Sequence, residues 1–145
     1  PEPWTPRRQQ AAREWINERL DEGGAAVDLA AARTIVGTAG TITSLAALIY
    51  QVPEYSPKIT HGSSPTPTQW ERALETMIED PVEVKQELPA MPPGRADVIG
   101  GGALIWEQIL TRLGVLPAVD PAPGAPLVVV SEHDILDGLV LQSPQ

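Results

Sequence analysis

One stretch decides the fold of this chain: Thr34-Ile35-Val36-Gly37-Thr38-Ala39-Gly40-Thr41, continuing as Ile42-Thr43-Ser44-Leu45-Ala46-Ala47-Leu48. It predicts a buried strand over 34–37, a turn of small residues, and a helix over 41–50. Backbone N–H groups left unpaired in such a turn, and at the start of the following helix, attract an anion. The candidate phosphate-binding residues are therefore Gly37, Thr38, Ala39, Gly40 and Thr41. A plain strand-to-helix turn would have the same residues, and no Gly-Lys-Ser/Thr follows, so the stretch is not a P-loop.

A second informative stretch is Gly94-Arg95-Ala96-Asp97-Val98-Ile99-Gly100-Gly101-Gly102-Ala103-Leu104-Ile105. It predicts a long helix over 94–113, ended by Gly114 in a left-handed conformation. Glycine inside a helix costs about 1 kcal/mol relative to alanine. Three adjacent glycines therefore indicate close packing against another helix or a sheet, more than contact with a ligand. Arg95 either pairs with a carboxylate or carbonyl that holds the domain together or reaches a substrate phosphate.

The first half of the chain is predicted to be mostly helical. Thr5-Pro6 has the residues of a helix N-cap followed by proline at the first position, and this helix should end at Gly23-Gly24. A short helix is expected over 25–32, and a proline-rich loop over 51–67. A capping box over 68–71 should start a helix that buries Trp70, Leu74, Met77 and Ile78.

The second half adds one strand and further helices. Asp80-Pro81 is expected to cap and restart a helix, and 117–126 is too rich in proline for regular structure. The apolar run over 127–130 predicts a second buried strand, and 131–134 should cap a last helix. We expect the two strands to be parallel members of one layer, buried on both faces.

Two short strands do not form a stable sheet by themselves. We therefore expect further strands upstream of Pro1, which would make this chain a fragment of a longer protein. Sheet edges left open in this way predict self-association, such as a homodimer, or an exposed apolar surface.

Composition narrows the function classes. The length of 145 residues suits a single domain over 1–145, and the net charge of −9 argues against a protein that binds duplex nucleic acid. No apolar run reaches the roughly 20 residues of a membrane span. The absence of cysteine excludes disulfides and thiolate chemistry and fits a cytoplasmic protein. The two histidines, His61 and His133, share no short spacing with each other or with carboxylates, so neither a metal site nor a Ser-His-Asp arrangement is predicted.

The motifs, taken in order, resemble one known family. They are Val36-Gly37-Thr38-Ala39-Gly40-Thr41 with its helix, His61, the run from Arg95 to Ala103, Val130-Ser131, and Ile135 to Leu139. This order resembles the C-terminal part of the exopolyphosphatase and guanosine pentaphosphate phosphatase family. The resemblance implies an α/β fold, namely part of the second domain of an actin/hexokinase-like (ribonuclease H-like) protein. That domain part would be helix-rich, with a small parallel sheet that lacks its upstream strands.

The resemblance also implies an activity for the intact protein. It would remove terminal phosphate from inorganic polyphosphate or guanosine pentaphosphate, with this chain as one wall of the cleft between two domains. The family's catalytic carboxylate and its magnesium ligands precede this region, so we expect no catalytic residue and no metal ligand here, and no activity of the chain alone. Two alternatives stay open. One is the nucleotide-binding half of a sugar or acetate kinase-like phosphotransferase, and the other is a non-enzymatic interaction domain on the same fold.

Overall fold

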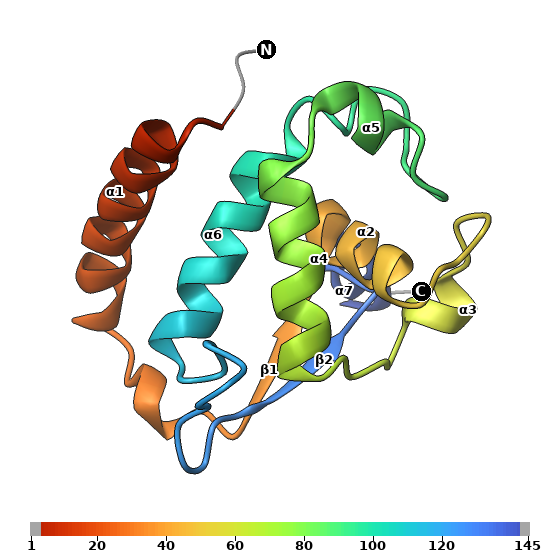
Figure 1. Ribbon diagram of the computed structural model, residues 1–145. Helices are drawn as coiled ribbons and strands as arrows, with labels where there is room; N and C mark the ends of the chain where they lie inside the picture. The colour runs from red at the N-terminus through yellow and green to blue at the C-terminus, as the bar shows by residue number, and fades with distance from the viewer. Residues whose placement is uncertain (1–3, 143–145) are drawn as a thin grey trace.

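The computed structural model describes residues 4–142 (Figure 1). Three long helices lie side by side, with α6 packed between α1 and α4, and α2 packs across α4 and α6. The core between them contains Leu45, Trp70, Leu74, Leu104 and Leu110, all nearly inaccessible to solvent. The elements are α1 (Pro6–Gly24), η1 (Leu29–Ala31), β1 (Thr34–Gly37), α2 (Ala39–Ile49), α3 (Pro57–Thr60), α4 (Pro67–Glu79), α5 (Val82–Gln86), α6 (Ile99–Arg112), β2 (Leu127–Val130) and α7 (Ile135–Gln142).

The two strands pair in parallel, as predicted, with Thr34 opposite Leu127 and Gly37 opposite Val130. The prediction that both faces are buried is wrong. Side chains alternate across a sheet, and here one face packs on the helices while the other is open. Val36 is 59% exposed and Leu127 is 57% exposed, because no described element covers that face. The expected exposed apolar surface is thus present, whereas self-association stays a prediction.

Helix α1 begins as predicted, because the Thr5 hydroxyl accepts a hydrogen bond from the N–H of Arg8 and Pro6 takes the first position. Two hydrogen bonds between the Arg13 guanidinium and the Glu107 carboxylate, of 2.7 and 3.0 Å, join α1 to α6. The helix predicted over 25–32 is wrong in extent. Only the single 3₁₀ turn η1 forms there, after α1 has extended to Gly24 with Ala25 as its C-cap.

The boundaries of α2 and α4 both lie earlier than predicted. Helix α2 starts at Ala39 rather than at Thr41, and the loop before α4 contains the short helix α3. The capping box of α4 uses Thr66 and Gln69, because Pro67 is suited to the first helical position. The residues predicted to be buried by this helix, Trp70, Leu74, Met77 and Ile78, are indeed in the core.

Helix α6 starts five residues later than predicted. Gly94 has a positive φ of 73°, and residues 94–98 form turns that carry Arg95 before the helix begins at Ile99. The end is as predicted, with Gly114 at φ 74°. Asp80 does not cap α5. It terminates α4 instead, and Pro81 precedes α5.

The glycines of α6 serve packing, as predicted. A Cβ at Gly100 would lie 2.5 Å from Nε1 of Trp4, and a Cβ at Gly102 would lie 2.3 Å from Oγ1 of Thr41. Both glycines therefore accommodate side chains that lie closer to the α6 backbone than any larger residue would allow. Position 101 is less crowded, with its nearest neighbour, Trp4, at 3.5 Å.

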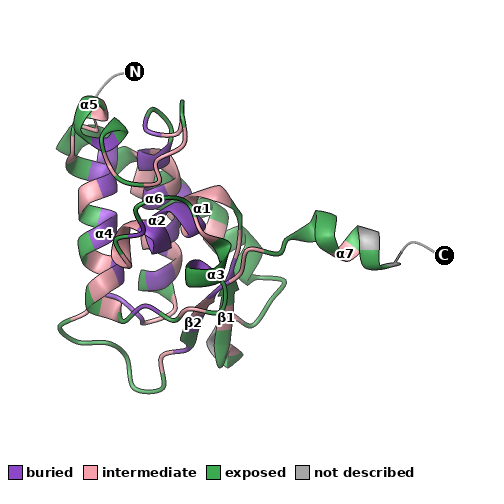
Figure 2. Cartoon of the chain, turned by 90° about the vertical axis from the view of Figure 1, so that its right-hand side faces the viewer, coloured by how far each residue is buried: buried purple, intermediate pink, exposed green. Residues whose placement is uncertain are grey.

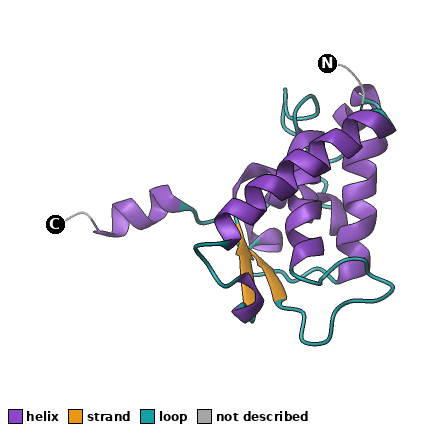
Figure 3. Cartoon of the chain, turned by 90° about the vertical axis from the view of Figure 1, so that its left-hand side faces the viewer, coloured by secondary structure: helices purple, strands orange, loops and turns teal. Residues whose placement is uncertain are grey.

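Helix α7 extends away from the other helices (Figures 2 and 3). Several of its apolar side chains are exposed, namely Ile135, Leu136, Leu139 and Leu141. Helix α7 is also short, and no helix in the described part of the chain has the length and apolar character needed to cross a membrane.

Candidate functional site

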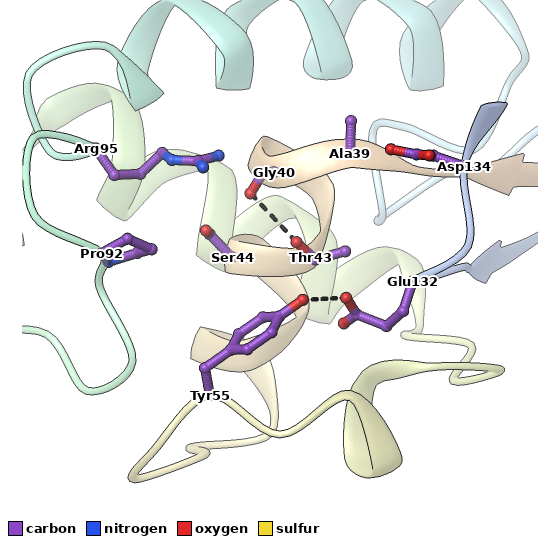
Figure 4. A pocket seen from close by; sticks show the side chains of 9 residues that line it. All are labelled: Ala39, Gly40, Thr43, Ser44, Tyr55, Pro92, Arg95, Glu132 and Asp134. Carbon is purple, nitrogen blue, oxygen red and sulfur yellow. Dashed lines mark hydrogen bonds between the residues drawn. The ribbon is translucent and has the colours of Figure 1, made fainter. Parts of the chain in front are cut away.

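A pocket of about 330 Å³ lies at the start of α2 (Figure 4). It gathers residues from α2, from the loop before α3, from the turn before α6 and from the segment after β2. The lining residues are Ala39, Gly40, Thr43, Ser44, Tyr55, Pro92, Arg95, Glu132 and Asp134.

The N-terminus of α2 forms the first wall of this pocket. Thr38 precedes the helix in an extended conformation, and its side chain makes no capping hydrogen bond. The first N–H groups of a helix have no partner within the helix, and the helix dipole places partial positive charge there. Ala39, rather than a glycine, adopts the left-handed conformation in this turn, with φ 70°. This end of α2 therefore provides donors and positive potential to the pocket.

Arg95 forms the second wall. Its guanidinium lies directly over Gly40, where a Cβ would be 1.7 Å from Nη1 and 2.6 Å from Nη2 (Figure 4). The side chain is half-buried, yet within residues 4–142 it makes no hydrogen bond and no ion pair. The carboxylate or carbonyl partner expected for a structural Arg95 is therefore not found in this part of the chain.

The carboxylates of the pocket, in contrast, already have donors. Tyr55 and Thr60 each donate a hydroxyl hydrogen bond to the carboxylate of Glu132. Asp134 accepts a 2.8 Å hydrogen bond from the N–H of Leu136 at the start of α7. Partial burial, and then the hydrogen bond to Glu132, raise the pKa of the Tyr55 phenol above 10.0. The pocket thus combines two carboxylates that accept hydrogen bonds with an arginine that has no partner among residues 4–142.

Of the five predicted phosphate-binding residues, only two line the pocket. Ala39 and Gly40 line the pocket. Gly37 is part of the core, because a Cβ there would lie 3.0 Å from Ile42 and 3.3 Å from Trp106. The Thr41 side chain packs against Gly102 instead of facing the pocket. Thr38 is the N-cap residue of α2 and is not among the residues that line the pocket.

Sequence reasoning missed six lining residues, namely Thr43, Ser44, Tyr55, Pro92, Glu132 and Asp134. A signal existed for two of them, because residues three and four positions after Gly40 share its face of the helix. Tyr55 and Glu132 offered none, since 77 residues separate them and only the loops bring them together.

The two histidines, which lie far apart in sequence, are in contact in the structure. Their ring centroids are 4.8 Å apart in an edge-to-face arrangement, and Nδ1 of His61 accepts a 3.2 Å hydrogen bond from the N–H of Glu132. Within residues 4–142, no three His, Asp or Glu side chains are grouped so that they would hold a metal ion. The described part of the chain therefore contains no candidate metal centre.

Comparison with known proteins identifies the family of this chain. The model of the Ppx/GppA phosphatase family matches residues 2–119. Exopolyphosphatase 2 of Mycobacterium tuberculosis is 36% identical over 140 residues, which are 97% of this chain and 42% of that protein. A bifunctional 3-dehydroquinate synthase/phosphatase of Fusobacterium nucleatum is 29% identical over 131 residues, 90% of this chain and 18% of its own length. The chain thus spans less than half of the length of these relatives.

Solved structures show the same fold. The crystal structure of an exopolyphosphatase-like protein superimposes with a TM-score of 0.85 at 30% identity, over 95% of this chain and 43% of that one. The Ppx/GppA phosphatase of Aquifex aeolicus superimposes with a TM-score of 0.74 at 26% identity, over 97% of this chain and 42% of the other. The helix-rich α/β fold with a two-stranded parallel sheet therefore corresponds to part of these actin-like structures. The family model matches most of this chain. This match, together with the superpositions, shows that the chain belongs to the Ppx/GppA phosphatase family.

Proposed function

We propose that this chain is the C-terminal portion of a phosphohydrolase that removes terminal phosphate from inorganic polyphosphate, guanosine pentaphosphate, or both. In this proposal the pocket at the start of α2 forms one wall of the cleft that holds the phosphoanhydride. The observation that carries it is the guanidinium of Arg95, which lies against the start of α2 and makes no hydrogen bond or ion pair with any other residue of the described range 4–142.

The chemistry of the pocket suits a phosphoryl group. A guanidinium offers paired N–H donors that match two oxygens of one phosphate, and the helix N-terminus adds backbone donors and positive potential. Gly40 lets the guanidinium lie close to the start of the helix. In this proposal both sets of donors bind the same phosphate. In the reaction, these groups would bind and orient the phosphate chain and stabilise the charge that develops on its oxygens.

The remaining chemistry would come from outside this chain. The attack of water on a terminal phosphate needs a general base, and we place that carboxylate in the part of the protein that the chain does not include. Magnesium, with its ligands in that same part, would neutralise phosphate charge. The 145-residue chain alone should therefore bind phosphate without turning it over.

A binding measurement tests the proposal. Inorganic pyrophosphate, titrated into the chain and followed by NMR or calorimetry, should bind, and Arg95→Gln should weaken binding by about tenfold or more, as expected for the loss of a charged bidentate contact. The exposed Arg72, on α4 and away from the pocket, gives the matched control Arg72→Gln, which should bind like the wild type. Equal affinities of Arg95→Gln and the wild type would contradict the proposal.

An activity measurement tests the prediction that the chain alone does not hydrolyse polyphosphate. Polyphosphate incubated with the chain and magnesium should release no phosphate above background. Turnover would show that the general base lies within these 145 residues. Binding of ATP in place of pyrophosphate would favour the kinase-like alternative.

A further inference from the structure

We infer that Tyr55, Thr60 and His61 are positioning residues that hold the carboxylate of Glu132 away from Arg95 and so keep the guanidinium open to an anion. The inference rests on the proposed function, since it explains how an anion site persists beside a carboxylate. It concerns a part of the pocket wall that carries no phosphate donor.

The first observation is that Arg95 and Glu132 line the same pocket and carry opposite charges. An arginine and a carboxylate that share a partly desolvated pocket attract one another strongly, and their charge-assisted hydrogen bonds are among the strongest in proteins. Even so, no ion pair forms between them, and Figure 4 shows Arg95 and Glu132 on opposite sides of the pocket. A competing set of contacts must therefore hold the carboxylate.

The second observation identifies those contacts. Both oxygens of Glu132 are occupied, Oε2 by the Tyr55 hydroxyl and Oε1 by the Thr60 hydroxyl. The backbone is held as well, because the N–H of Glu132 donates to Nδ1 of His61 at 3.2 Å. Thr60 is completely buried, so its hydroxyl is not a mobile surface group, and the Ser56 carbonyl at 3.3 Å is its other possible acceptor.

The third observation is that the segment supplying these donors is itself fastened to β2. The N–H of Gly62 donates to the carbonyl of Val130 at 2.8 Å, and the N–H of Val130 donates to the carbonyl of Ser63 at 2.9 Å. Two backbone hydrogen bonds thus fix the register between the loop after α3 and the end of β2.

The consequence is a competition inside the pocket. Once its donors are removed, Glu132 would turn toward Arg95 and form an ion pair that occupies the guanidinium. An anionic ligand would then have to displace that carboxylate before it binds. The Tyr55 and Thr60 hydroxyls therefore act on phosphate affinity through Glu132, without touching the phosphate.

The experiment uses the 145-residue chain and inorganic pyrophosphate as the probe. The double variant Tyr55→Phe/Thr60→Val should bind pyrophosphate about tenfold more weakly, which corresponds to about 1.4 kcal/mol. Adding Glu132→Gln should restore the affinity to within about threefold of the wild type, because the amide has no charge with which to compete. Tyr50→Phe, which removes a hydroxyl outside the pocket, serves as the control. A triple variant as weak as the double variant would overturn the inference, because damage to the fold alone is not rescued by Glu132→Gln.

His61 provides an independent comparison. His61→Asn keeps an acceptor near the Glu132 N–H and should retain most of the affinity, whereas His61→Leu removes the acceptor and should lose it. Equal affinities of these two variants would contradict a positioning role for His61.

A second readout separates this inference from the proposed function. The NMR signal of the Arg95 Nε–H should shift, and its exchange with water should slow, in Tyr55→Phe/Thr60→Val, and both changes should disappear when Glu132→Gln is added. If the wild-type chain binds no pyrophosphate and this signal still responds, the proposed function fails and the positioning role stands. If the signal is the same in all three proteins, the positioning role is wrong.

Discussion

The guanidinium of Arg95 occupies the space that any side chain at position 40 would need, since a Cβ there would lie 1.7 Å from Nη1. Arg95 and Gly40 are 55 positions apart in the chain, and they meet because the turn before α6 lies across the start of α2 (Figure 4). This contact defines the candidate phosphate pocket and makes the identity of residue 40 directly testable.

We predict that Gly40→Val weakens pyrophosphate binding by about tenfold or more and changes the free energy of unfolding by less than about 1 kcal/mol. The fold should survive, because the atoms in the way belong to the far end of a flexible side chain that can swing aside. Calorimetric titration and urea unfolding would measure the two quantities. Normal binding by a well-folded variant would reduce this turn to a strand-to-helix connection.

Thr41→Val should have the smaller effect on binding. Its side chain packs against Gly102 and does not line the pocket, and the backbone donors of the turn remain in place. Pyrophosphate affinity within about threefold of the wild type is expected. A loss as large as that of Gly40→Val would mean that the Thr41 hydroxyl takes part in binding.

Alanine substitutions at two adjacent glycines of α6 should have opposite effects on the stability of the protein. Gly102→Ala should destabilise the protein by about 1–3 kcal/mol, because the new methyl group would overlap Oγ1 of Thr41 on the neighbouring helix. Gly101→Ala should be neutral or stabilising by up to about 1 kcal/mol, since the new methyl group would make only an ordinary contact with Trp4, 3.5 Å away, and alanine favours the helix. Thermal unfolding of both variants provides the comparison, and equal melting temperatures would show that the contact between α2 and α6 is not tight.

Ala39 offers a stabilising substitution. Its φ of 70° is unfavourable for a residue with a Cβ, so Ala39→Gly should raise the free energy of unfolding by about 0.5–1 kcal/mol. The matched control is Ala11→Gly at an exposed position inside α1, which should lower it by about 1 kcal/mol. Urea denaturation at neutral pH measures both, and a loss of stability in Ala39→Gly would mean that this backbone conformation carries no strain.

The burial of Lys85 predicts a specific pH dependence of the free energy of unfolding. The side chain is only 3% exposed, its Nζ donates to the Met77 carbonyl at 3.2 Å, and burial lowers its pKa below 10.5, against the opposing attraction of Asp80 and Asp97. The folded state therefore binds this proton less tightly than the unfolded state does. Lys85 should therefore make the protein more stable as the pH rises from the pKa of Lys85 in the folded state toward 10.5.

The measurement compares urea unfolding at pH 8 and pH 10. Lys85→Met should remove this pH-dependent gain, whereas Lys58→Met, at an exposed position of α3, should retain it. Identical pH dependence in Lys85→Met and the wild type would contradict an electrostatic cost of burying this lysine.

Local signals in the sequence determined most of the secondary structure. Both strands, the cap of α1, the buried face of α4 and the end of α6 at Gly114 were predictable, because each depends on residues within one or two turns of each other. Several errors lie at boundaries where two local rules competed, as at Thr66 and Thr68, or where a single glycine such as Gly94 delayed a helix. The short helix α3 and the open face of the sheet were missed as well.

The sequence by itself determined the family, the parallel pairing of 34–37 with 127–130, and the location of a candidate anion site at the start of α2. Only the tertiary structure decided which residues face that site. In the folded chain, Gly37 and Thr41 are packing residues, and Arg95 lies over Gly40. Tyr55, Thr60 and His61 form hydrogen bonds with Glu132. The physical reason is that a helix or strand arises from neighbours in the chain, whereas a pocket arises where loops far apart in sequence are fixed by the packing of a shared core.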